Sequence, residues 1–241
     1  MKTTLTEQLN KKAASLSFDL FGVADPMCFE LQRAPEGHKP KDYLPSVRSV
    51  IILGMKVIDS ILQTAPSGIY SKHYDTLNEL LSSGAYQLAK WLEDKGYRSM
   101  NFPETNGYEI IWAQYNAGYT GFVPCFNHMA VAVAAGLGKR GACGVVLTPQ
   151  YGPRQRWISV ITEAPLDFGK EMEEEICLEK REANSCVKCA EACPIQAISL
   201  DDGTDVRRCW IHWTGLREKD LACGVCIKAC PVGRKKGKLP Q

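Results

Sequence analysis

The sequence predicts an α+β protein with a separate, cysteine-rich last third. Apolar, β-branched runs at 18–25 and 46–57 are typical of buried strands. Residues 75–95 carry the apolar stripe of a long amphipathic helix. Eight of the eleven cysteines in the 241-residue chain lie in the last third. We therefore expect a mixed helix-and-strand domain over residues 1–168 and a smaller domain over 169–241.

The helices of the first domain follow from their caps and apolar periodicity. Residues 3–16 place leucines on one face behind a threonine cap and predict a helix. The helix over 75–95 has Thr76 and Glu79 spaced as a capping box. Gly96 is a suitable residue to end this helix, because it tolerates the left-handed conformation found there.

The remaining elements are predicted from prolines and glycines, which interrupt regular structure, and from short apolar runs. The proline- and glycine-containing segment 33–45 is predicted to be a loop. In residues 128–135 Ala and Val alternate, which fits either a helix or a strand. Strands are predicted over 144–149 and 156–165, and a polar helix over 169–182 leads into the cysteine-rich domain.

The cysteine-rich domain contains two copies of the spacing Cys-x2-Cys-x3-Cys-Pro. Each copy is the end of the bacterial ferredoxin run Cys-x2-Cys-x2-Cys-x3-Cys-Pro, in which the cysteine before proline ligates the other cluster. One zinc site would explain Cys-x2-Cys pairs but not two such units, and disulfides are typical of small secreted proteins. The spacing therefore predicts two 4Fe–4S clusters, and the cysteines of the copies are Cys186, Cys189 and Cys193, then Cys223, Cys226 and Cys230.

Each copy lacks the first cysteine of the full run, so the remaining upstream cysteines are expected to complete the two sets. One cluster is assigned to Cys177, Cys186, Cys189 and Cys230, and the other to Cys209, Cys223, Cys226 and Cys193. The eight residues between Cys177 and Cys186 exceed a tight loop. A buried free thiol on the predicted helix is therefore the alternative for Cys177.

Two stretches of the first domain point to a ligand. Five aromatic residues between 108 and 122, interleaved with amide side chains, fit a cavity wall, with core packing as the alternative for each. Gly136, Gly138 and Gly141 match the dinucleotide-binding fingerprint. A strand is predicted after these glycines and no helix starts there, so we predict no NAD site. The glycines instead indicate backbone that comes close to something flat or bulky.

The bulk properties are those of an ordinary globular protein. A net charge of +2 predicts no obligatory partnership with nucleic acid or an anionic membrane. No apolar stretch is long enough to span a membrane, and the N-terminal residues carry no export signal. We therefore expect a cytoplasmic protein.

Several segments together resemble the epoxyqueuosine reductase and reductive dehalogenase superfamily. They include FDLFGVAD (18–25), GLGKRG (136–141), TPQYGPRQR (148–156) and CWIHWTG (209–215), which precedes the last Cys-x2-Cys-x3-Cys-Pro. The resemblance covers most of the chain, and TPQYGPR and the Cys-x3-Trp spacing lean towards the dehalogenases. It implies a nitroreductase-like cofactor-binding domain followed by a two-cluster, ferredoxin-like domain.

The resemblance also implies a bound corrinoid. Cobalamin is expected in its base-off form without a protein ligand to cobalt, reduced by low-potential electrons from the clusters, so that it in turn reduces a small molecule. FMN is the alternative cofactor, because nitroreductase-like folds also bind flavin. The alternative function is electron transfer to a partner's corrinoid or to a flavin, without substrate chemistry. The corrinoid contacts implied are His128, Gly136, Gly138, Lys139, Gly141, Thr148, Tyr151, Gly152 and Arg154, with a purely structural role as the alternative for His128.

Departures from the family patterns bear on the substrate. The proton-donating aspartate of epoxyqueuosine reductases has no counterpart near Phe122, and neither their helical-repeat domain nor the twin-arginine signal of respiratory dehalogenases is seen. We therefore expect a substrate other than epoxyqueuosine in tRNA, with Tyr115 or Tyr119 as the catalytic proton donor. Expected partners are a low-potential electron donor such as ferredoxin or flavodoxin, and a small-molecule substrate or a corrinoid protein.

Overall fold

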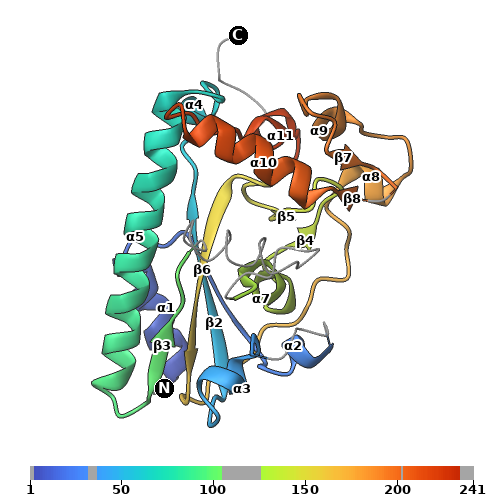
Figure 1. Ribbon diagram of the computed structural model, residues 1–241. Helices are drawn as coiled ribbons and strands as arrows, with labels where there is room; N and C mark the ends of the chain where they lie inside the picture. The colour runs from blue at the N-terminus through green and yellow to red at the C-terminus, as the bar shows by residue number, and fades with distance from the viewer. Residues whose placement is uncertain (1–2, 32–36, 105–125, 202, 234–241) are drawn as a thin grey trace. The chain divides into compact units, whose positions relative to one another are not determined.

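The computed structural model describes residues 3–31, 37–104, 126–201 and 203–233 (Figure 1). The chain divides into two compact units, each assembled from three segments. The sheet unit comprises residues 1–55, 74–137 and 156–171, and the cysteine unit comprises residues 56–73, 138–155 and 172–241. The predicted boundary between domains at residue 168 stays a prediction.

A four-stranded sheet in the order β1-β2-β6-β3 forms the core of the sheet unit. β1 pairs antiparallel with β2, and β3 pairs antiparallel with β6. The central strands β2 and β6 are almost completely buried, which explains their continuous apolar sequences. Three of the four predicted strands are confirmed in this sheet, and β3 is an addition. The bounds are β1 Leu20–Ala24, β2 Ser49–Lys56, β3 Ser99–Asn101 and β6 Gln155–Thr162.

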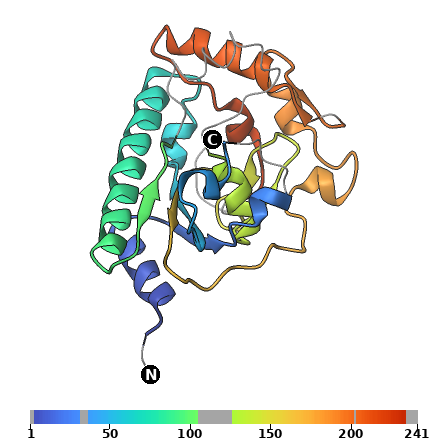
Figure 2. The same ribbon diagram turned by 60° about the horizontal axis from the view of Figure 1, so that its bottom comes forward.

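Helices lie on both sides of this sheet. Figures 1 and 2 show the long helix α5 on one side and α7 on the other, where α7 packs against β1 and α2. Cover on both faces accounts for the burial of the central strands. The bounds are α1 Leu5–Ser15, α2 Cys28–Leu31, α3 Pro40–Tyr43, α5 Gly68–Glu93 and α7 His128–Ala134.

Local caps decide where α1 and α7 begin. The Thr4 hydroxyl accepts the Glu7 N–H, and the Glu7 carboxylate accepts the Thr4 N–H, so the predicted first helix has a complete capping box. The Asn127 side chain accepts the N–H of Ala130 and caps α7. The segment that fitted a helix or a strand is therefore helical.

Helix α5 begins seven residues before the predicted start at residue 75. The Ser67 hydroxyl accepts the N–H of Tyr70 and acts as the cap, so the predicted capping box at Thr76 and Glu79 is wrong. The predicted end is confirmed, because Gly96 has a φ of +88° just beyond the helix. The buried stripe that holds α5 on the sheet unit consists of Leu77, Leu81, Ala85, Leu88 and Leu92.

The cysteine unit is built from short elements. Residues 169–177 form no helix, so the predicted helix over 169–182 is wrong except for α8. Gly169 donates its N–H to Val23, and the glutamates at 171, 174 and 175 would repel one another on a helix. The elements are α4 Asp59–Leu62, β4 Lys139–Arg140, β5 Val146–Leu147, α8 Leu178–Arg181, α9 Lys188–Glu191, β7 Ile198–Ser199, β8 Gly203–Thr204, α10 Val206–Arg217 and α11 Val225–Ala229.

Two other segments differ in detail from the sequence predictions. The predicted strand over 144–149 contributes only β5, which pairs with β4. The predicted loop over 33–45 contains the one-turn helix α3, with Pro40 at its first position. The glycine loop 136–141 follows α7 and leads into β4, so it lacks the strand-before and helix-after context of an NAD site.

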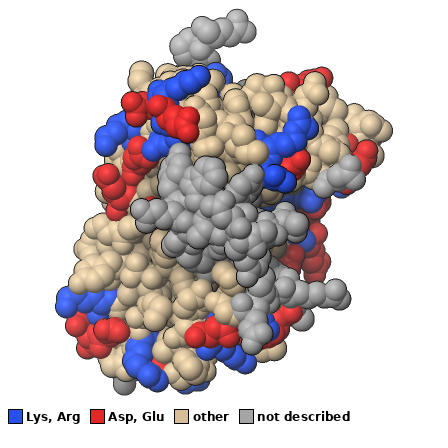
Figure 3. Space-filling view, viewed as in Figure 1, with Lys and Arg blue, Asp and Glu red and all other residues tan. Residues whose placement is uncertain are grey.

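Within the described residues, no helix is both long enough and apolar enough to cross a bilayer. Acidic and basic side chains are interspersed on the face shown in Figure 3, in line with the small net charge. The predicted cytoplasmic location stays a prediction.

Candidate metal centre

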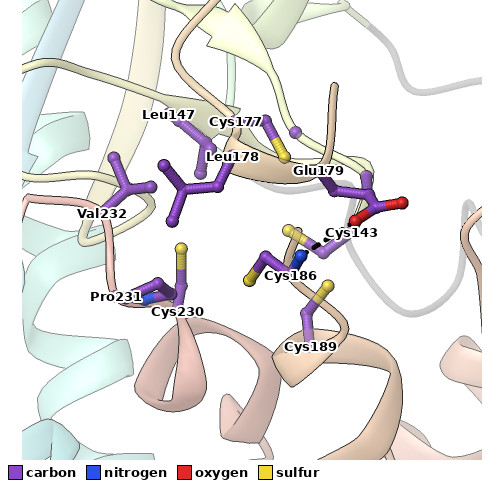
Figure 4. Close-up of a pocket in the computed structure, with 12 residues that line it drawn as sticks. Cys143, Leu147, Cys177, Leu178, Glu179, Cys186, Cys189, Cys230, Pro231 and Val232 are labelled. Carbon is purple, nitrogen blue, oxygen red and sulfur yellow. Dashed lines mark hydrogen bonds between the residues drawn. The ribbon is translucent and has the colours of Figure 1, made fainter. Parts of the chain in front are cut away.

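Five thiols of the cysteine unit line one cavity (Figure 4). The cavity holds about 350 Å³ of empty space, part of it open to solvent, and Leu147, Leu178 and Val232 form apolar parts of its wall. Four of the thiols are the set predicted for the first cluster. The five are Cys143, Cys177, Cys186, Cys189 and Cys230, all without disulfides.

Helix α8 positions the loop before the first Cys-x2-Cys pair. The Glu179 carboxylate accepts the backbone N–H of Cys186 at 2.9 Å and that of Asn184 at 2.9 Å. These two bonds lower the pKa of Glu179 and fix the direction in which Cys186 enters the cavity. Cys177 occupies the N-cap position of α8 without a side-chain hydrogen bond to the helix, so the segment 177–186 has a thiol at each end.

Arg154 holds the turn at Cys230. Its side chain is 2% exposed, and its guanidinium donates to the carbonyl oxygens of Cys230 and Val232, the latter at 2.6 Å. The guanidinium also lies 3.7 Å from the Asp59 carboxylate. Burial raises the pKa of the Cys230 thiol, and the Arg154 charge acts in the opposite direction. Arg154 was predicted as a corrinoid contact, and these partners explain its position without a cofactor.

The four cysteines predicted for the second cluster also come together. Cys209 is exposed on one side, and partial desolvation of its thiol, followed by the nearby Cys223 and Cys193, raises its pKa. Burial, with Cys223 and Cys209 next in importance, raises the pKa of Cys226 to about 12. Each thiol of this set therefore interacts with another member of the set. Cys209 lies on α10, Cys226 on α11, Cys223 in the loop before α11, and Cys193 just after the end of α9.

The Cys193–Pro194 turn is built like the turn at Cys230. The Ala197 N–H donates to the Cys193 sulfur at 3.2 Å. Arg208 of α10 donates to the carbonyl oxygens of Ile195 at 2.6 Å and Gln196 at 3.3 Å. Each Cys–Pro turn is thus held by an arginine from another part of the cysteine unit.

The donor chemistry fits thiolate-ligated clusters. Within the described ranges, no three His, Cys, Asp or Glu side chains are arranged around a single metal-ion position. The thiols of the first set instead surround a space (Figure 4). A 4Fe–4S cluster takes its thiolates around a body of iron and sulfide, so it fits this arrangement of donors.

The glycines predicted to contact a corrinoid lie against the protein's own backbone. A Cβ on Gly136 would lie 2.1 Å from the Lys170 carbonyl oxygen, one on Gly138 2.1 Å from that of Leu147, and one on Gly152 2.0 Å from that of Val232. Gly141 would meet the Leu147 side chain at 3.0 Å. These contacts account for the glycines without a cofactor, and their role as corrinoid contacts stays a prediction.

His128 of the sheet unit is held by hydrogen bonds at both ring nitrogens. Nε2 donates to the Pro103 carbonyl at 2.9 Å, because that oxygen can only accept, and Nδ1 pairs with the Ser159 hydroxyl at 2.9 Å. Burial, together with the charge of Arg156, lowers the pKa of His128 to about 4, although the bond to Pro103 opposes this shift. The ring is neutral at ordinary pH, in accord with the structural alternative considered for it.

The other predicted corrinoid contacts lie in the cysteine unit. The buried Thr148 hydroxyl donates to Gln155 at 3.3 Å and accepts the N–H of Tyr151 at 3.1 Å. The Lys56 ammonium lies 5.7 Å from the centre of the Tyr151 ring, and Lys139 is in β4. The predicted catalytic residues Tyr115 and Tyr119 lie outside the described residues.

Three residues of this site were not predicted from the sequence. Cys143 lines the cavity, Glu179 holds the loop at Cys186, and Arg208 holds the turn after Cys193. Cys143 sits in the GACG run directly after the glycine loop, far from the cysteine-rich third. A cysteine between glycines before a strand was the signal that could have found it.

No family model matches the chain, but individual relatives do. A tetrachloroethene reductive dehalogenase of Sulfurospirillum multivorans is 26% identical over 206 residues, which cover 76% of this chain and 35% of that protein. One from Desulfitobacterium hafniense is 31% identical over 174 residues, 68% of this chain and 24% of that protein. An epoxyqueuosine reductase of Lactococcus garvieae is 23% identical over 272 residues, 96% of this chain and 70% of that protein. The chain therefore spans about a third or less of the dehalogenases.

Solved structures share the fold. The reductive dehalogenase NpRdhA in complex with 3-bromo-4-hydroxybenzoic acid matches with a TM-score of 0.74 at 20% identity, over 95% of this chain and 32% of that chain. An epoxyqueuosine reductase with an epoxyqueuosine-modified tRNA-Tyr stem loop matches with a TM-score of 0.63 at 21% identity, over 95% and 65%. The predicted mixed fold of helices and strands is confirmed at this level.

The prediction that nucleic acid is not a partner is wrong. An epoxyqueuosine reductase of the same fold has been solved with a modified tRNA stem loop, and relatives of that name match almost the whole chain. The prediction failed because net charge averages over the molecule, whereas RNA binding needs only a local set of phosphate contacts and shape recognition. The exclusion of epoxyqueuosine in tRNA as a substrate was based on the missing aspartate near Phe122, which lies outside the described residues, so that substrate remains a candidate.

The two groups of relatives and the two groups of structures agree. Each covers most of this chain, and the sequence segments that carry the resemblance lie in both units. The chain belongs to the superfamily that contains the reductive dehalogenases and the epoxyqueuosine reductases.

Proposed function

We propose that the protein is an oxidoreductase in which two 4Fe–4S clusters pass low-potential electrons to a bound cobalamin. The observation that carries the proposal is the cavity in which Cys177, Cys186, Cys189 and Cys230 gather together with Cys143. The electrostatic proximity of Cys209, Cys223, Cys226 and Cys193 supports it. The names of the relatives, all reductases, support the enzyme class. A neighbouring structure that suggests a mechanism for B12-dependent dehalogenation, with a TM-score of 0.70, supports the corrinoid. None of the comparisons supports FMN.

The proposed architecture is a nitroreductase-like domain followed by a ferredoxin-like one. The repeated Cys–Pro turns and the short helices α9 and α11, which pack together, support the ferredoxin-like part. Arg154, Arg208 and Glu179 would hold the loops that present the thiolates. When bound, cobalamin supplies a strongly reducing cobalt centre. Clusters of low reduction potential are suited to deliver the electrons that reduce this cobalt.

For the substrate, we propose a small halogenated molecule. Two observations favour it: the dehalogenases are the relatives of higher identity, 26–31% against 23%, and NpRdhA matches with a TM-score of 0.74 against 0.63 for the tRNA complex. Reduction of epoxyqueuosine in tRNA is the second candidate, because those relatives match over most of their own length. Tyr115 or Tyr119 stays the proposed proton donor for the first candidate.

Cobalamin binding tests the cofactor. Cob(II)alamin mixed with an excess of the cluster-loaded protein should give a base-off EPR spectrum, without nitrogen superhyperfine splitting from a lower ligand. FMN added under the same conditions serves as the control and should remain free. A cobalamin spectrum unchanged by the protein would contradict the proposal.

Turnover tests the substrate. The reduced, cobalamin-loaded protein is incubated separately with tetrachloroethene, with a bromophenol and with epoxyqueuosine-containing tRNA. Halide release from either of the first two is the expected result. Turnover of the tRNA alone would replace the halogenated substrate with the second candidate. Reduction of cobalamin without any turnover would favour electron delivery to a partner's corrinoid.

A further inference from the structure

Helix α10 of the cysteine unit carries an apolar surface that is not buried. None of its residues Val206–Arg217 is buried, although they include two tryptophans, an isoleucine and a valine. Val206 is 53% exposed and Ile211 is 56% exposed. Large apolar side chains that gather on an exposed surface are typical of an interaction site.

The helical repeat brings the exposed residues to one side. Val206, Arg207, Trp210 and Ile211 are spaced i, i+1, i+4 and i+5 on α10. Residues three and four apart are neighbours on a helix surface, so these four side chains form one continuous face. We call these four residues the α10 face.

The other side of α10 faces the second set of cysteines. Cys209 is two residues from Ile211, a spacing that puts it on nearly the opposite side of the helix. The N–H of Asp205, at the start of α10, donates to the Ala197 carbonyl at 2.7 Å and holds the helix on the loop after Cys193. A partner on the α10 face would therefore be one helix away from the proposed second cluster.

The charge of α10 favours an acidic partner. The helix contains three arginines and no acidic residue between its caps Asp205 and Glu218. Arg208 bonds to backbone carbonyl oxygens, and Arg217 bonds to the Ser71 hydroxyl. These partners are uncharged, so they orient the guanidinium groups without cancelling their charge. An apolar centre with arginines beside it is the composition of a protein–protein interface.

The aromatic residues favour a protein over RNA as the occupant. The rings of Trp210 and Trp213 stack on each other with centroids 5.0 Å apart, and the Arg217 guanidinium lies 5.5 Å from the centre of the Trp213 ring. These contacts occupy ring faces on which RNA bases would stack. Val206 and Ile211 have neither rings nor polar side-chain atoms for bases and phosphates.

We propose that the α10 face is the docking site of an acidic redox protein that delivers electrons to the cluster on Cys193, Cys209, Cys223 and Cys226. The inference rests on the proposed two-cluster function. In each encounter one electron leaves the reduced partner and reduces the cluster from the +2 to the +1 state, and no bond is made or broken. Transient redox encounters bury little surface, which suits a face of one helix.

The test uses the holoprotein, with flavodoxin as the acidic probe. Calorimetry measures binding of oxidised flavodoxin, and anaerobic stopped-flow spectroscopy measures cluster reduction by reduced flavodoxin. Ile211→Glu should weaken binding and slow this reduction about tenfold, because it puts a carboxylate at the centre of the interface. Arg207→Glu should have its largest effect at low ionic strength, where charge steers the encounter.

Two controls separate docking from damage to the clusters. Leu80→Glu changes a side chain that is 50% exposed on α5 of the sheet unit, and it should behave like the wild type. Dithionite is a small reductant that needs no docking site, so it should reduce the clusters of all the variants equally. Iron content should also be the same in every variant.

Four results would overturn the inference. The first two are a wild-type protein that does not bind flavodoxin, and an Ile211→Glu variant with wild-type binding and reduction rates. Weaker binding of epoxyqueuosine-containing tRNA to the variants, with flavodoxin unaffected, would make the face an RNA surface. A wild-type dimer that Ile211→Glu dissociates, with flavodoxin again unaffected, would assign the face to a second copy of the chain.

Failure of the proposed function is seen separately from failure of this inference. Iron analysis of the wild-type protein would then not give two clusters. Binding of oxidised flavodoxin is measured without electron transfer, so the calorimetry still shows whether the α10 face is the docking site.

Discussion

Gly136 is a residue whose missing side chain can be tested directly. Its φ is +74°, and a Cβ there would lie 2.1 Å from the Lys170 carbonyl oxygen. Gly96 has a similar φ of +88°, but a Cβ there would meet nothing within 4 Å. Both glycines belong to the sheet unit, so they form a matched pair.

Alanine substitution at both positions separates the energetic cost of backbone strain from the cost of the steric clash with Lys170. Gly96→Ala should lower the unfolding free energy by about 1–2 kcal/mol, the usual cost of a left-handed non-glycine residue. Gly136→Ala should lower it further, because the chain at Lys170 must also move. Denaturant unfolding of both variants measures the difference. Equal losses would mean that the approach of Lys170 does not require glycine.

The lowered pKa of His128 predicts that the stability of the sheet unit depends on pH. Its pKa in the folded protein is about 4, below the ordinary value of about 6.5, so folding favours the neutral ring. This contribution is complete above about pH 6.5 and is lost as the pH falls towards 4, because the unfolded state takes up the proton first. Stability should therefore fall more steeply from pH 6.5 to 4.5 in the wild type than in His128→Gln. A His128 ring-proton NMR titration centred near pH 6.5 would contradict this account.

At the scale of elements, the two Cys–Pro turns form a second matched pair. Arg154 is 2% exposed and donates to the carbonyls of Cys230 and Val232, and Arg208 does the same for Ile195 and Gln196. Hydrogen bonds from a charged donor are worth about 1.5–3 kcal/mol each. Lysine keeps the charge at either position but loses the forked geometry.

Lysine at each position should therefore weaken a different cluster. Arg154→Lys should lower the occupancy of the cluster that includes Cys230, and Arg208→Lys that of the cluster that includes Cys193. The effect of Arg154→Lys should be the larger, because Arg154 and its partner Cys230 are buried, whereas Arg208 is exposed. Iron analysis with EPR measures occupancy. Cys209→Ala, which should lack the second cluster, serves to identify the signals. If both variants weakened the same cluster, the assignment of each Cys–Pro turn to a different cluster would be contradicted.

The helices also show which structural features sequence patterns can predict. Periodicity located α5 and its end at Gly96, because a buried stripe and a terminal glycine are local properties. Its start was misplaced, because Ser67 and not Thr76 caps the helix. The helix expected over 169–182 failed for a tertiary reason, since Gly169 pairs its N–H with Val23, far away in the sequence.

For the whole molecule, the candidate site was predictable where it depends on the spacing of cysteines along the sequence. The Cys-x2-Cys-x3-Cys-Pro units, with one cysteine upstream of each, indicate eight ligands and their grouping from the sequence alone. Cys143 and the structural role of Arg154 were not predictable, because both come from the segment 138–155, which joins the cysteine unit only in the fold. The close approach of backbone at the glycines was foreseen, but its partner, the chain itself, was not.

The crossed grouping of ligands is the central claim, and paired variants test it most directly. The wild-type protein should contain about eight irons per chain, four for each cluster. Cys186→Ser combined with Cys230→Ser alters two ligands of one cluster, so the other cluster should keep its EPR signal and its irons. Cys186→Ser combined with Cys193→Ser alters one ligand of each cluster although both belong to one sequence motif, and both signals should change. The opposite outcome, with the Cys186 and Cys193 pair affecting one cluster and the Cys186 and Cys230 pair affecting both, would contradict the account.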